Sequence, residues 1–243
     1  MVDIHLHILP GVDDGPRTLD ESLRLAEELV SQGVRKAAAT PHWGRLSRYS
    51  SLEEIKEGFL RVKESLEKAG IPLELCLGFE IFLNLETLED IKKLGRQLGL
   101  SQTSYFLVEF PFQFIYPNWD YLLSSIKDMG LRPIIAHPER YSYILTRPSI
   151  LEEMVSMGAL AQVNAESLVG VYGKEIKRFS RNCIKDGLCH LVASDAHGLS
   201  GRPPYISEAK GELEGILGEE ELREIFEERP AAVLAGEEIW KRS

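Results

Sequence analysis

Short apolar runs and helix-like runs alternate along the whole chain, and this alternation limits the possible folds most strongly. Strands are predicted at residues 2–7, 34–40, 73–83, 105–110, 133–136, 160–163 and 190–193. Helices are predicted at residues 19–32, 52–70, 88–98, 119–129, from 149, at 174–185, and at 208–241 with breaks at Gly218 and Arg229-Pro230. Strands that alternate with helices indicate parallel βαβ units. Seven such units without a Pro- or Gly-rich linker predict an α/β fold with one distorted (β/α)7 TIM-like barrel, and an open doubly wound sheet is the alternative.

Three capping boxes are expected, each at the start of a helix. They are Thr18 to Glu21, Ser51 to Glu54 and Ser149 to Glu152. In each, a hydroxyl three residues before a glutamate can accept a backbone N–H that the first helical turn leaves unpaired.

The composition is that of an ordinary globular protein. The 243 residues are 44% hydrophobic and 27% charged, a size expected for a single domain spanning residues 1–243. No apolar run approaches the roughly 18 residues of a membrane span, and no secretory signal pattern precedes the first strand. Three cysteines without zinc-finger spacing fit reduced thiols in the cytoplasm. A formal net charge of −10 argues against nucleic acid as a partner.

The first strand carries a His-x-His pair, His5 and His7. Because successive side chains of a strand point to opposite faces, the two imidazoles are expected on one face and Ile4 and Leu6 on the other. Two imidazoles so placed can bind one metal ion, but a surface strand with two unrelated histidines fits this stretch equally well. The turn that follows delivers Asp14 just beyond the strand.

Nearly all other candidate residues of metal-binding type lie at or just after the ends of predicted strands, and Glu80 interrupts the strand predicted at 73–83. With the first strand and its loop, the candidate ligands are His5, His7, Asp14, His42, Glu80, Glu109, His137, Asp195 and His197. The carboxyl ends of barrel strands are where barrel active sites are built. Since one metal takes three or four protein ligands, nine candidates indicate two or three divalent ions. Nitrogen and oxygen ligands without sulfur suit Mn²⁺, Fe²⁺ or Zn²⁺.

Such a multinuclear centre favours hydrolysis of phosphate esters, because it acidifies water and stabilises both oxygens of an in-line displacement. Arg140 follows His137 and Arg202 follows His197, and guanidinium groups match phosphate geometry. Surface salt bridges are the alternative for both arginines. Arginines 45 and 48 and the aromatic residues Phe112, Phe114, Tyr116 and Trp119 are expected either to contact substrate or to pack the barrel top.

The combination of motifs resembles the metal-dependent protein-tyrosine phosphatases of bacterial capsule and exopolysaccharide loci, the CpsB/YwqE type of the PHP superfamily. The resemblance rests on Asp3-Ile4-His5-Leu6-His7, Val12-Asp13-Asp14-Gly15-Pro16, Thr40-Pro41-His42, Gly78-Phe79-Glu80, Val108-Glu109-Phe110-Pro111, His137-Pro138-Glu139-Arg140-Tyr141, Ser194-Asp195-Ala196-His197 and Gly201-Arg202-Pro203-Pro204. Trp43 departs from the family pattern, in which a polar or basic residue is common after the histidine, and this concerns substrate preference.

The resemblance implies a distorted seven-stranded barrel that holds three metals, often Mn²⁺. It places the first metal on His5, His7, Glu80 and Asp195, the second on Glu80, Glu109 and His137, and the third on Asp14, His42 and His197. It also implies that Arg140 and Arg202 bind phosphate. His42 is the candidate proton donor, if the leaving group needs one.

The implied function is hydrolysis of phosphotyrosine in a protein, with the tail of a bacterial tyrosine kinase that regulates capsule or exopolysaccharide synthesis as the expected substrate. The first alternative is a small-molecule phosphatase of the histidinol-phosphate type. An amidohydrolase is disfavoured because no lysine ends a predicted strand. A metal-stabilised docking module without turnover is the alternative outside enzymes. No cysteine has an arginine six residues later, which disfavours a thiol phosphatase.

Overall fold

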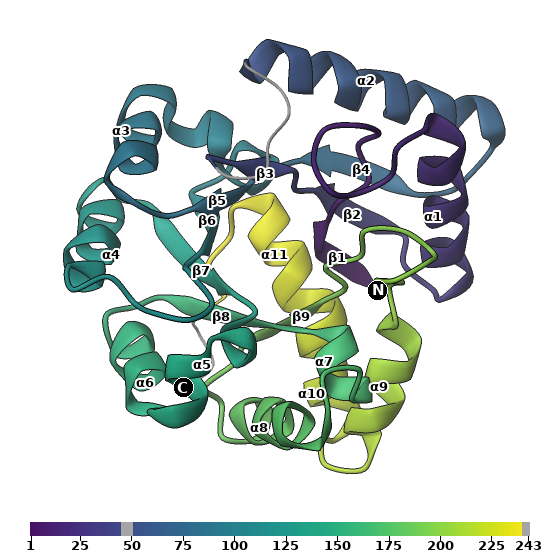
Figure 1. The fold of residues 1–243 in the computed structure, drawn as a ribbon. Helices are drawn as coiled ribbons and strands as arrows, with labels where there is room; N and C mark the ends of the chain where they lie inside the picture. The colour runs from purple at the N-terminus through teal and green to yellow at the C-terminus, as the bar shows by residue number, and fades with distance from the viewer. Residues whose placement is uncertain (45–50, 240–243) are drawn as a thin grey trace.

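Parallel strands form a ring with helices around it in the computed structural model, which describes residues 1–44 and 51–239 (Figure 1). The strands are β1 Val2–Leu6, β2 Lys36–Ala39, β3 His42–Trp43, β4 Glu74–Leu77, β5 Glu80–Phe82, β6 Tyr105–Glu109, β7 Arg132–Ala136, β8 Leu160–Asn164 and β9 Leu191–Ala193. The helices are α1 Leu19–Ser31, α2 Leu52–Ala69, α3 Leu85–Leu94, η1 Gly95–Leu98, η2 Leu100–Gln102, α4 Trp119–Asp128, η3 Pro138–Arg140, α5 Ser142–Thr146, α6 Ser149–Ser156, α7 Ala165–Val169, α8 Lys174–Lys185, α9 Ile206–Glu214, α10 Glu219–Arg223, η4 Glu224–Glu228 and α11 Arg229–Ala235. The predicted TIM-like α/β architecture is confirmed.

One predicted strand is split in two, and another is followed by a short strand that was not predicted. The strand expected at 34–40 is β2, and β3 follows it beyond Pro41, whereas the strand expected at 73–83 becomes β4 and β5, separated at Gly78 and Phe79. Pro41 has no N–H to donate to the ladder. A Cβ at Gly78 would lie 2.7 Å from Leu100 Cδ2, so only glycine fits where η2 approaches this backbone. The single strand predicted at 73–83 is therefore wrong.

The breaks at Pro41 and at Gly78 and Phe79 divide the strands into two parallel sheets, in the orders β1-β2-β4 and β3-β5-β6-β7-β8-β9. Backbone hydrogen bonds connect the sheets across the splits, from Gly78 N to Ala39 O at 2.8 Å and from Glu80 N to Pro41 O at 3.2 Å. The segment after β9 returns to the end of β1 with Asp195 N donating to His5 O at 2.9 Å. A bridge between Leu6 and Ala196 lies beside it. These contacts bring the last strand next to the first, which the open-sheet alternative would not do.

The register of β1 is irregular between Asp3 and Leu6, where it pairs with β2. Ile4 packs inside the ring with Ala38 and Ala193, whereas Leu6 belongs to the core between strands and helices. The prediction that Ile4 and Leu6 share one face is therefore wrong, because an irregular register interrupts strict alternation.

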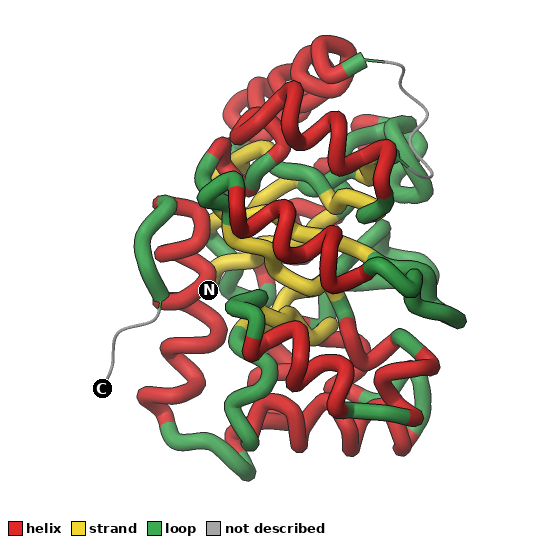
Figure 2. The backbone as a smooth tube through the Cα atoms, turned by 90° about the vertical axis from the view of Figure 1, so that its left-hand side faces the viewer, coloured by secondary structure: helices red, strands yellow, loops and turns green. Residues whose placement is uncertain are grey.

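The inside of the ring is filled by small and aliphatic side chains and covered at one end by α11. Val233 and Leu234 of α11 pack with Ile4, Leu107 and Ile134 of the strands. Thr103 Oγ1, just before β6, donates to Val233 O at 3.2 Å, so α11 covers the amino ends of the strands. Long loops project from the opposite side, on the right in Figure 2. Because α11 covers the amino ends, the carboxyl ends of the strands are available for a functional site.

The capping residues behave as predicted at two of the three expected positions. Thr18 and Glu21 form the reciprocal capping box of α1, and Ser51 Oγ accepts from Glu54 N at the start of α2. The third box is wrong, because Pro148 occupies the N-cap position of α6 and makes Ser149 the first helical residue, with no side-chain cap. Asn84 caps α3, which therefore begins three residues earlier than predicted.

The C-terminal helical region breaks at Gly218, as predicted, but not at Arg229-Pro230. The turn η4 is a π-helix that leads directly into α11, and Pro230 lies in the first turn of α11. A π-turn widens the spacing of the backbone bonds, which accommodates a residue that has no N–H. Helix α11 ends at Ala235, with Gly236 as its C-cap, before the predicted end at 241, a position outside the described residues.

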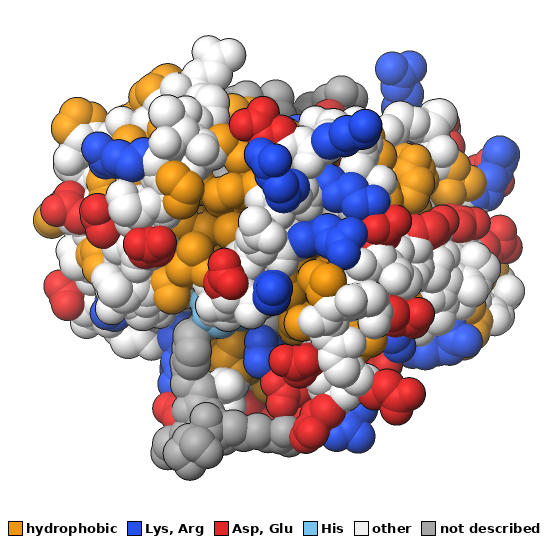
Figure 3. Space-filling view, turned by 90° about the horizontal axis from the view of Figure 1, so that it is seen from below, with side chains coloured by type: hydrophobic (Ala, Val, Ile, Leu, Met, Phe, Trp, Pro, Cys, Tyr) orange, Lys and Arg blue, Asp and Glu red, His pale blue; other side chains and the backbone are white. Residues whose placement is uncertain are grey.

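Charged residues of both signs cover the helices. In Figure 3, which views the molecule from the side of α8 and α10, Lys and Arg side chains gather next to Asp and Glu side chains. Lys177 and Arg181 of α8 pair with Glu212 of α9 at 2.7 and 3.6 Å. Among the described residues, no helix combines the length and apolar character that crossing a bilayer requires.

The contact of α11 with the barrel interior predicts a large stability effect. Leu234 is 3% exposed, so Leu234→Ala is expected to lower the free energy of unfolding by about 2–4 kcal/mol through lost burial and a cavity. Leu60 is 55% exposed, and Leu60→Ala is expected to change it by less than about 0.5 kcal/mol. Urea denaturation of both variants checks this. Equal effects would contradict the assignment of α11 to the interior.

Candidate metal centre

The predicted ligands gather at the carboxyl ends of the strands, as the sequence predicts. Eight of the nine fall into three groups whose nitrogen and oxygen atoms lie within 4.8 Å of one another. The groups are His5, His7, Glu80 and Asp195; His7, Asp14, His42 and His197; and His42, Glu80 and Glu109. His7, His42 and Glu80 each belong to two groups, so the three groups form one continuous cluster.

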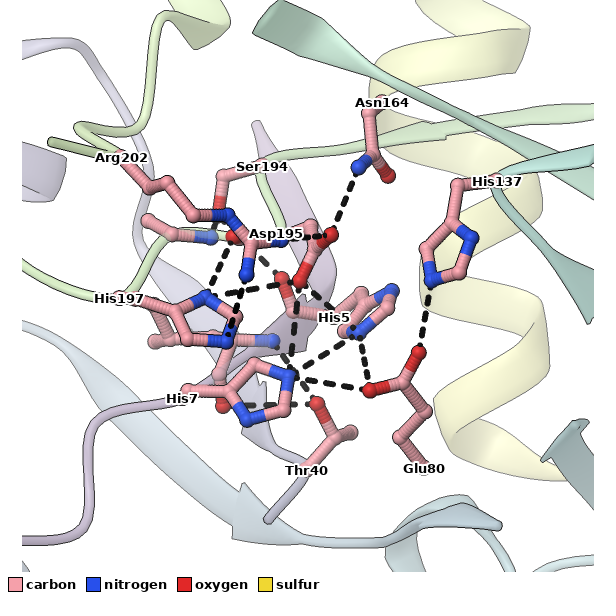
Figure 4. Close-up of polar contacts among 12 residues, drawn as sticks. His5, His7, Thr40, Glu80, His137, Asn164, Ser194, Asp195, His197 and Arg202 are labelled. Atoms are coloured by element: carbon pink, nitrogen blue, oxygen red, sulfur yellow. Dashed lines mark hydrogen bonds and ion pairs between the residues drawn. The ribbon is translucent and has the colours of Figure 1, made fainter. Parts of the chain in front are cut away.

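The first group is the most buried. His5 Nε2 lies 3.2 Å from His7 Nε2, 3.4 Å from Glu80 Oε2 and 3.3 Å from Asp195 Oδ1. All four side chains point toward one another, with no more than 1% of any of them exposed (Figure 4). This set is the one the resemblance implies for the first metal.

The group around Asp14 lies at the edge of the cluster. Asp14 Oδ1 is 3.4 Å from His42 Nε2 and 3.2 Å from His197 Nε2. The Asp14 side chain is 46% exposed, so this group opens to solvent. His7 belongs to this group as well, and its ring stacks on that of His197, with centroids 3.9 Å apart.

The group around Glu109 differs from the implied one in its histidine. His42 Nδ1 lies 3.0 Å from Glu80 Oε2 and joins Glu80 and Glu109. His137 lies next to this group, with its Nε2 2.8 Å from Glu80 Oε1. Glu80 therefore lies between His42, His137 and the first group, which is the position a bridging carboxylate requires.

The backbone at two of these positions is strained. His137 has φ +34° and Asp195 has φ +51°, a region that residues other than glycine rarely adopt. His137 directly follows β7 and Asp195 is the second residue after β9, and the unusual turn aims each side chain at the cluster. Backbone strain of this kind concentrates at functional sites.

Two amides on β8 connect the first group from behind. His5 Nδ1 lies 2.9 Å from Gln162 Oε1, Gln162 Nε2 donates to Asn164 Oδ1 at 2.9 Å, and Asn164 Nδ2 donates to Asp195 Oδ2 at 2.7 Å. Since the amide oxygen of Gln162 can only accept, the proton of His5 belongs on Nδ1. Nε2 of His5 then presents its lone pair to the cluster, as a metal ligand must.

Asp13 has the same role for His7. Its Oδ2 accepts from His7 Nδ1 at 2.7 Å and from His42 N at 3.2 Å. Asp13 is 2% exposed, whereas its neighbour Asp14 points into the cluster edge. Of the two adjacent aspartates, Asp13 therefore orients a histidine and Asp14 belongs to the cluster itself.

Sequence reasoning missed Gln162, Asn164 and Asp13 as parts of the site. Polar residues at alternate positions of the otherwise apolar strand β8 were the available signal for the two amides. Asp3 is a further addition. Its carboxylate accepts from Ser194 N at 3.0 Å and Ser194 Oγ at 2.5 Å, which joins β1 to the segment carrying Asp195.

The charges of the cluster favour a cation at its centre. Burial lowers the pKa of His5, but Asp195 and Glu80 outweigh it and raise that pKa to about 9. Burial also lowers the pKa of His42, but Glu80 and Asp14 outweigh it and raise that pKa to about 11. The histidines hold the pKa of Glu80 well below its usual range despite complete burial. Buried carboxylates that stabilise positive charge to this degree fit divalent metal ions.

The two predicted arginines converge on Asp195. Arg140 Nη1 lies 3.4 Å from Asp195 Oδ2, and Arg202 Nη2 donates to the same oxygen. Arg202 Nη1 lies 2.9 Å from His197 Nε2. Both arginine side chains remain about one-fifth to one-quarter exposed, at 21% and 25%. They border the cluster, so the surface salt bridge alternative does not describe them.

Most of the nearby aromatic residues pack against the protein. Phe112 lies under Arg140, Trp43 donates from Nε1 to Asp90 Oδ2 at 3.0 Å, and Tyr116 packs against the core. Trp119 also packs against the core, whereas Phe114 is 57% exposed. Arginines 45 and 48 lie outside the described residues.

The fold and the cluster together define a TIM-like barrel protein with a nitrogen- and oxygen-rich centre able to bind divalent metal. The family described as "Capsular polysaccharide synthesis, CpsB/CapC" matches residues 1–235. The chain therefore belongs to the CpsB/CapC family.

Relatives match nearly the whole chain. It is 37% identical over 220 residues to the tyrosine-protein phosphatase YwqE of Bacillus subtilis, covering 90% of this chain and 86% of the relative. It is 34% identical over 240 residues to the tyrosine-protein phosphatase CpsB of Streptococcus agalactiae, covering 96% and 98%. A solved structure from a study of YwqE from Bacillus subtilis and CpsB from Streptococcus pneumoniae, described as unique metal-dependent tyrosine phosphatases, superposes with a TM-score of 0.93 at 36% identity, covering 100% and 97%. A phosphotriesterase homology protein of Escherichia coli shares the fold alone, with a TM-score of 0.62 at 12% identity.

The amide pair on β8 generates a prediction about metal affinity. Gln162→Leu removes the acceptor that orients His5 and is expected to weaken divalent metal binding about 10- to 100-fold. His190 is the histidine outside the cluster, and its Nδ1 accepts from Ala161 N. His190→Asn, which keeps an acceptor there, is expected to bind metal like the wild type. Competition with a fluorescent chelator measures both affinities, and equal affinities of the two variants would show that Gln162 does not orient a ligand.

Proposed function

We propose that this protein is a metal-dependent phosphatase that hydrolyses phosphotyrosine in a protein substrate. The observation that carries the proposal is the buried histidine–carboxylate cluster with two arginines converging on its edge at Asp195. The relatives named as tyrosine-protein phosphatases support the choice of phosphotyrosine. The function rests on the site, because a barrel fold alone serves many chemistries.

The residues that we assign to two or three divalent ions, with Mn²⁺ first and Fe²⁺ or Zn²⁺ as alternatives, are His5, His7, Asp14, His42, Glu80, Glu109, His137, Asp195 and His197. Their nitrogen and oxygen donors fit these ions, and Gln162 and Asp13 present His5 and His7 in the required tautomer. Divalent ions held there would supply Lewis-acid charge and acidify water.

Arg140 and Arg202 bind the phosphoryl group in this proposal. Their guanidinium groups reach the same oxygen of Asp195 from two directions, so a phosphate beside Asp195 would meet both. Each can donate two hydrogen bonds to phosphate oxygens and stabilise the charge that they carry in the transition state.

His42 is assigned first to metal binding, because both of its ring nitrogens face carboxylates, Asp14 and Glu80. We keep its role as proton donor as the second assignment. A phenolate leaving group has a pKa of about 10, so its departure depends less on a proton donor than departure of a serine alkoxide would.

The wider setting follows the family. We infer that residues 1–243 act as one catalytic domain, in the cytoplasm, on the tail of a bacterial tyrosine kinase that controls capsule or exopolysaccharide synthesis. The family description names capsular polysaccharide synthesis, and all three cysteines are free, as in a reducing compartment. Small phosphate esters of the histidinol-phosphate type remain the second candidate substrates, because the cluster and arginines recognise phosphate whatever group it is attached to.

Metal removal and substrate comparison test the proposed function. Metal-stripped protein is expected to release no phosphate from a phosphotyrosine peptide, to gain activity with Mn²⁺, and to lose it again with chelator. Histidinol phosphate is expected to be the poorer substrate. Turnover of histidinol phosphate but not of the peptide would contradict the proposed function and indicate a small-molecule phosphatase. Metal binding without turnover of either substrate would favour a docking module without catalytic activity.

Replacement of Arg202 is expected to weaken phosphate binding and to leave metal binding unchanged. Arg202→Ala removes a charged donor, so KM for the peptide is expected to rise about 10- to 100-fold, in line with about 1.5–3 kcal/mol for a hydrogen bond to a charged group. Asn164 still holds Asp195 in this variant. Metal content, measured by mass spectrometry, is therefore expected to stay at the wild-type level, and its loss would contradict the assigned role.

A further inference from the structure

The segment from the end of β8 to the start of α8 carries none of the assigned metal ligands and neither of the arginines. Two of its side chains nevertheless contact the arginines that border the cluster. They are Glu166, on α7, and Tyr172, in the turn that follows α7.

Glu166 is a buried partner of Arg202. Its side chain is 1% exposed, and its Oε1 lies 3.5 Å from Arg202 Nε. Asp195 contacts the same guanidinium through Nη2. Two buried carboxylates therefore contact Arg202. A guanidinium restrained by two carboxylates loses little further freedom when it binds a ligand.

Tyr172 connects the two arginines. Its hydroxyl donates to Glu166 Oε1, the oxygen that faces Arg202. Its ring lies 4.9 Å from the guanidinium carbon of Arg140, and the ring of Phe112 lies 4.8 Å from the same carbon. The guanidinium of Arg140 thus contacts two aromatic rings, an arrangement that stabilises a cation and restricts its orientation.

The backbone holds Tyr172 in place. Val171 N donates to Glu166 O at 3.0 Å, and Gly173 N donates to Gly170 O at 3.0 Å. Gly170 and Gly173 have φ of +96° and +95°, values that favour glycine. The turn is thereby fixed to the helix that carries Glu166, so the hydroxyl and the carboxylate meet in a defined geometry.

We propose that Tyr172 is a positioning residue for the phosphate site: its ring orients Arg140, and its hydroxyl, through Glu166, orients Arg202. The proposal rests on the phosphate-binding role proposed above for the two arginines. It predicts an effect on phosphate affinity without an effect on metal content, since neither Tyr172 nor Glu166 is among the assigned metal ligands.

Two substitutions separate the two contacts of Tyr172. Tyr172→Phe removes the hydroxyl and keeps the ring, and is expected to weaken binding of inorganic phosphate by Mn²⁺-loaded protein about 2- to 10-fold, the range for one hydrogen bond. Tyr172→Leu removes both contacts and is expected to weaken it further, by about 10- to 50-fold in total. Tyr121, which is 52% exposed on α4, provides the matched control, and Tyr121→Phe is expected to bind phosphate like the wild type.

Double variants show whether each contact acts through its arginine. In an Arg202→Ala background, Tyr172→Phe is expected to have no further effect on phosphate binding. In an Arg140→Ala background, the effect of Tyr172→Phe is expected to persist, whereas the additional effect of Tyr172→Leu disappears. Unchanged phosphate binding by Tyr172→Leu, or a loss that is the same in all backgrounds, would overturn the proposal. Metal content is measured in every variant, and a fall with Tyr172→Phe would likewise overturn it.

Calorimetric titration with inorganic phosphate separates this proposal from the proposed function. Weakened phosphate binding by the Tyr172 variants, in a protein that does not hydrolyse phosphotyrosine peptide, would support the positioning role and reject the function. Wild-type phosphate binding by those variants, in a protein that does hydrolyse the peptide, would reject the positioning role and keep the function. Wild-type protein that binds no phosphate would overturn the positioning role, and turnover of the peptide would then decide the function.

Discussion

The burial of carboxylates against histidines at one end of the barrel is the constraint on which the rest of the structure depends. Glu80 and Asp195 are each 1% exposed, and a buried carboxylate is tolerated only when positive charge and hydrogen bonds compensate for lost hydration. Histidine rings surround both carboxylates, and arginines reach Asp195 from the solvent side. Divalent ions suit this arrangement, because they add positive charge that five neighbouring imidazoles supply only when protonated.

The irregularities of the barrel serve this cluster. The breaks at Pro41 and at Gly78-Phe79 end one sheet and start another, and in the second sheet His42 pairs directly with Glu80. The positive φ values of His137 and Asp195 redirect the chain one residue after β7 and two residues after β9. A regular barrel would keep the ladder continuous at these positions, whereas this one breaks it where side chains must converge.

The strands contribute two kinds of residue to the site, metal ligands and residues that orient them. Strands β1, β3, β5 and β6 carry assigned ligands, and the segments after β1, β7 and β9 carry the rest. Strand β8 instead supplies Gln162 and Asn164, which connect His5 to Asp195 from behind. The helix after β8 continues this role with Glu166, next to Arg202. Several of the residues that orient ligands and arginines therefore come from the β8 region, which contacts the site without forming its centre, and Asp13 after β1 adds the partner of His7.

The sequence by itself determined the strand–helix alternation, the Thr18 cap of α1 and the positions of His5, His7 and Asp195 near the ends of strands. These features depend on neighbours within a few residues, where periodicity and hydrogen-bonding capacity are local properties. Only the tertiary structure decided that 73–83 is two strands, because the break depends on the approach of Leu100 to Gly78. It also decided the grouping of the ligands and the roles of Gln162 and Tyr172. Those depend on distances between residues far apart in the chain, which no local pattern contains.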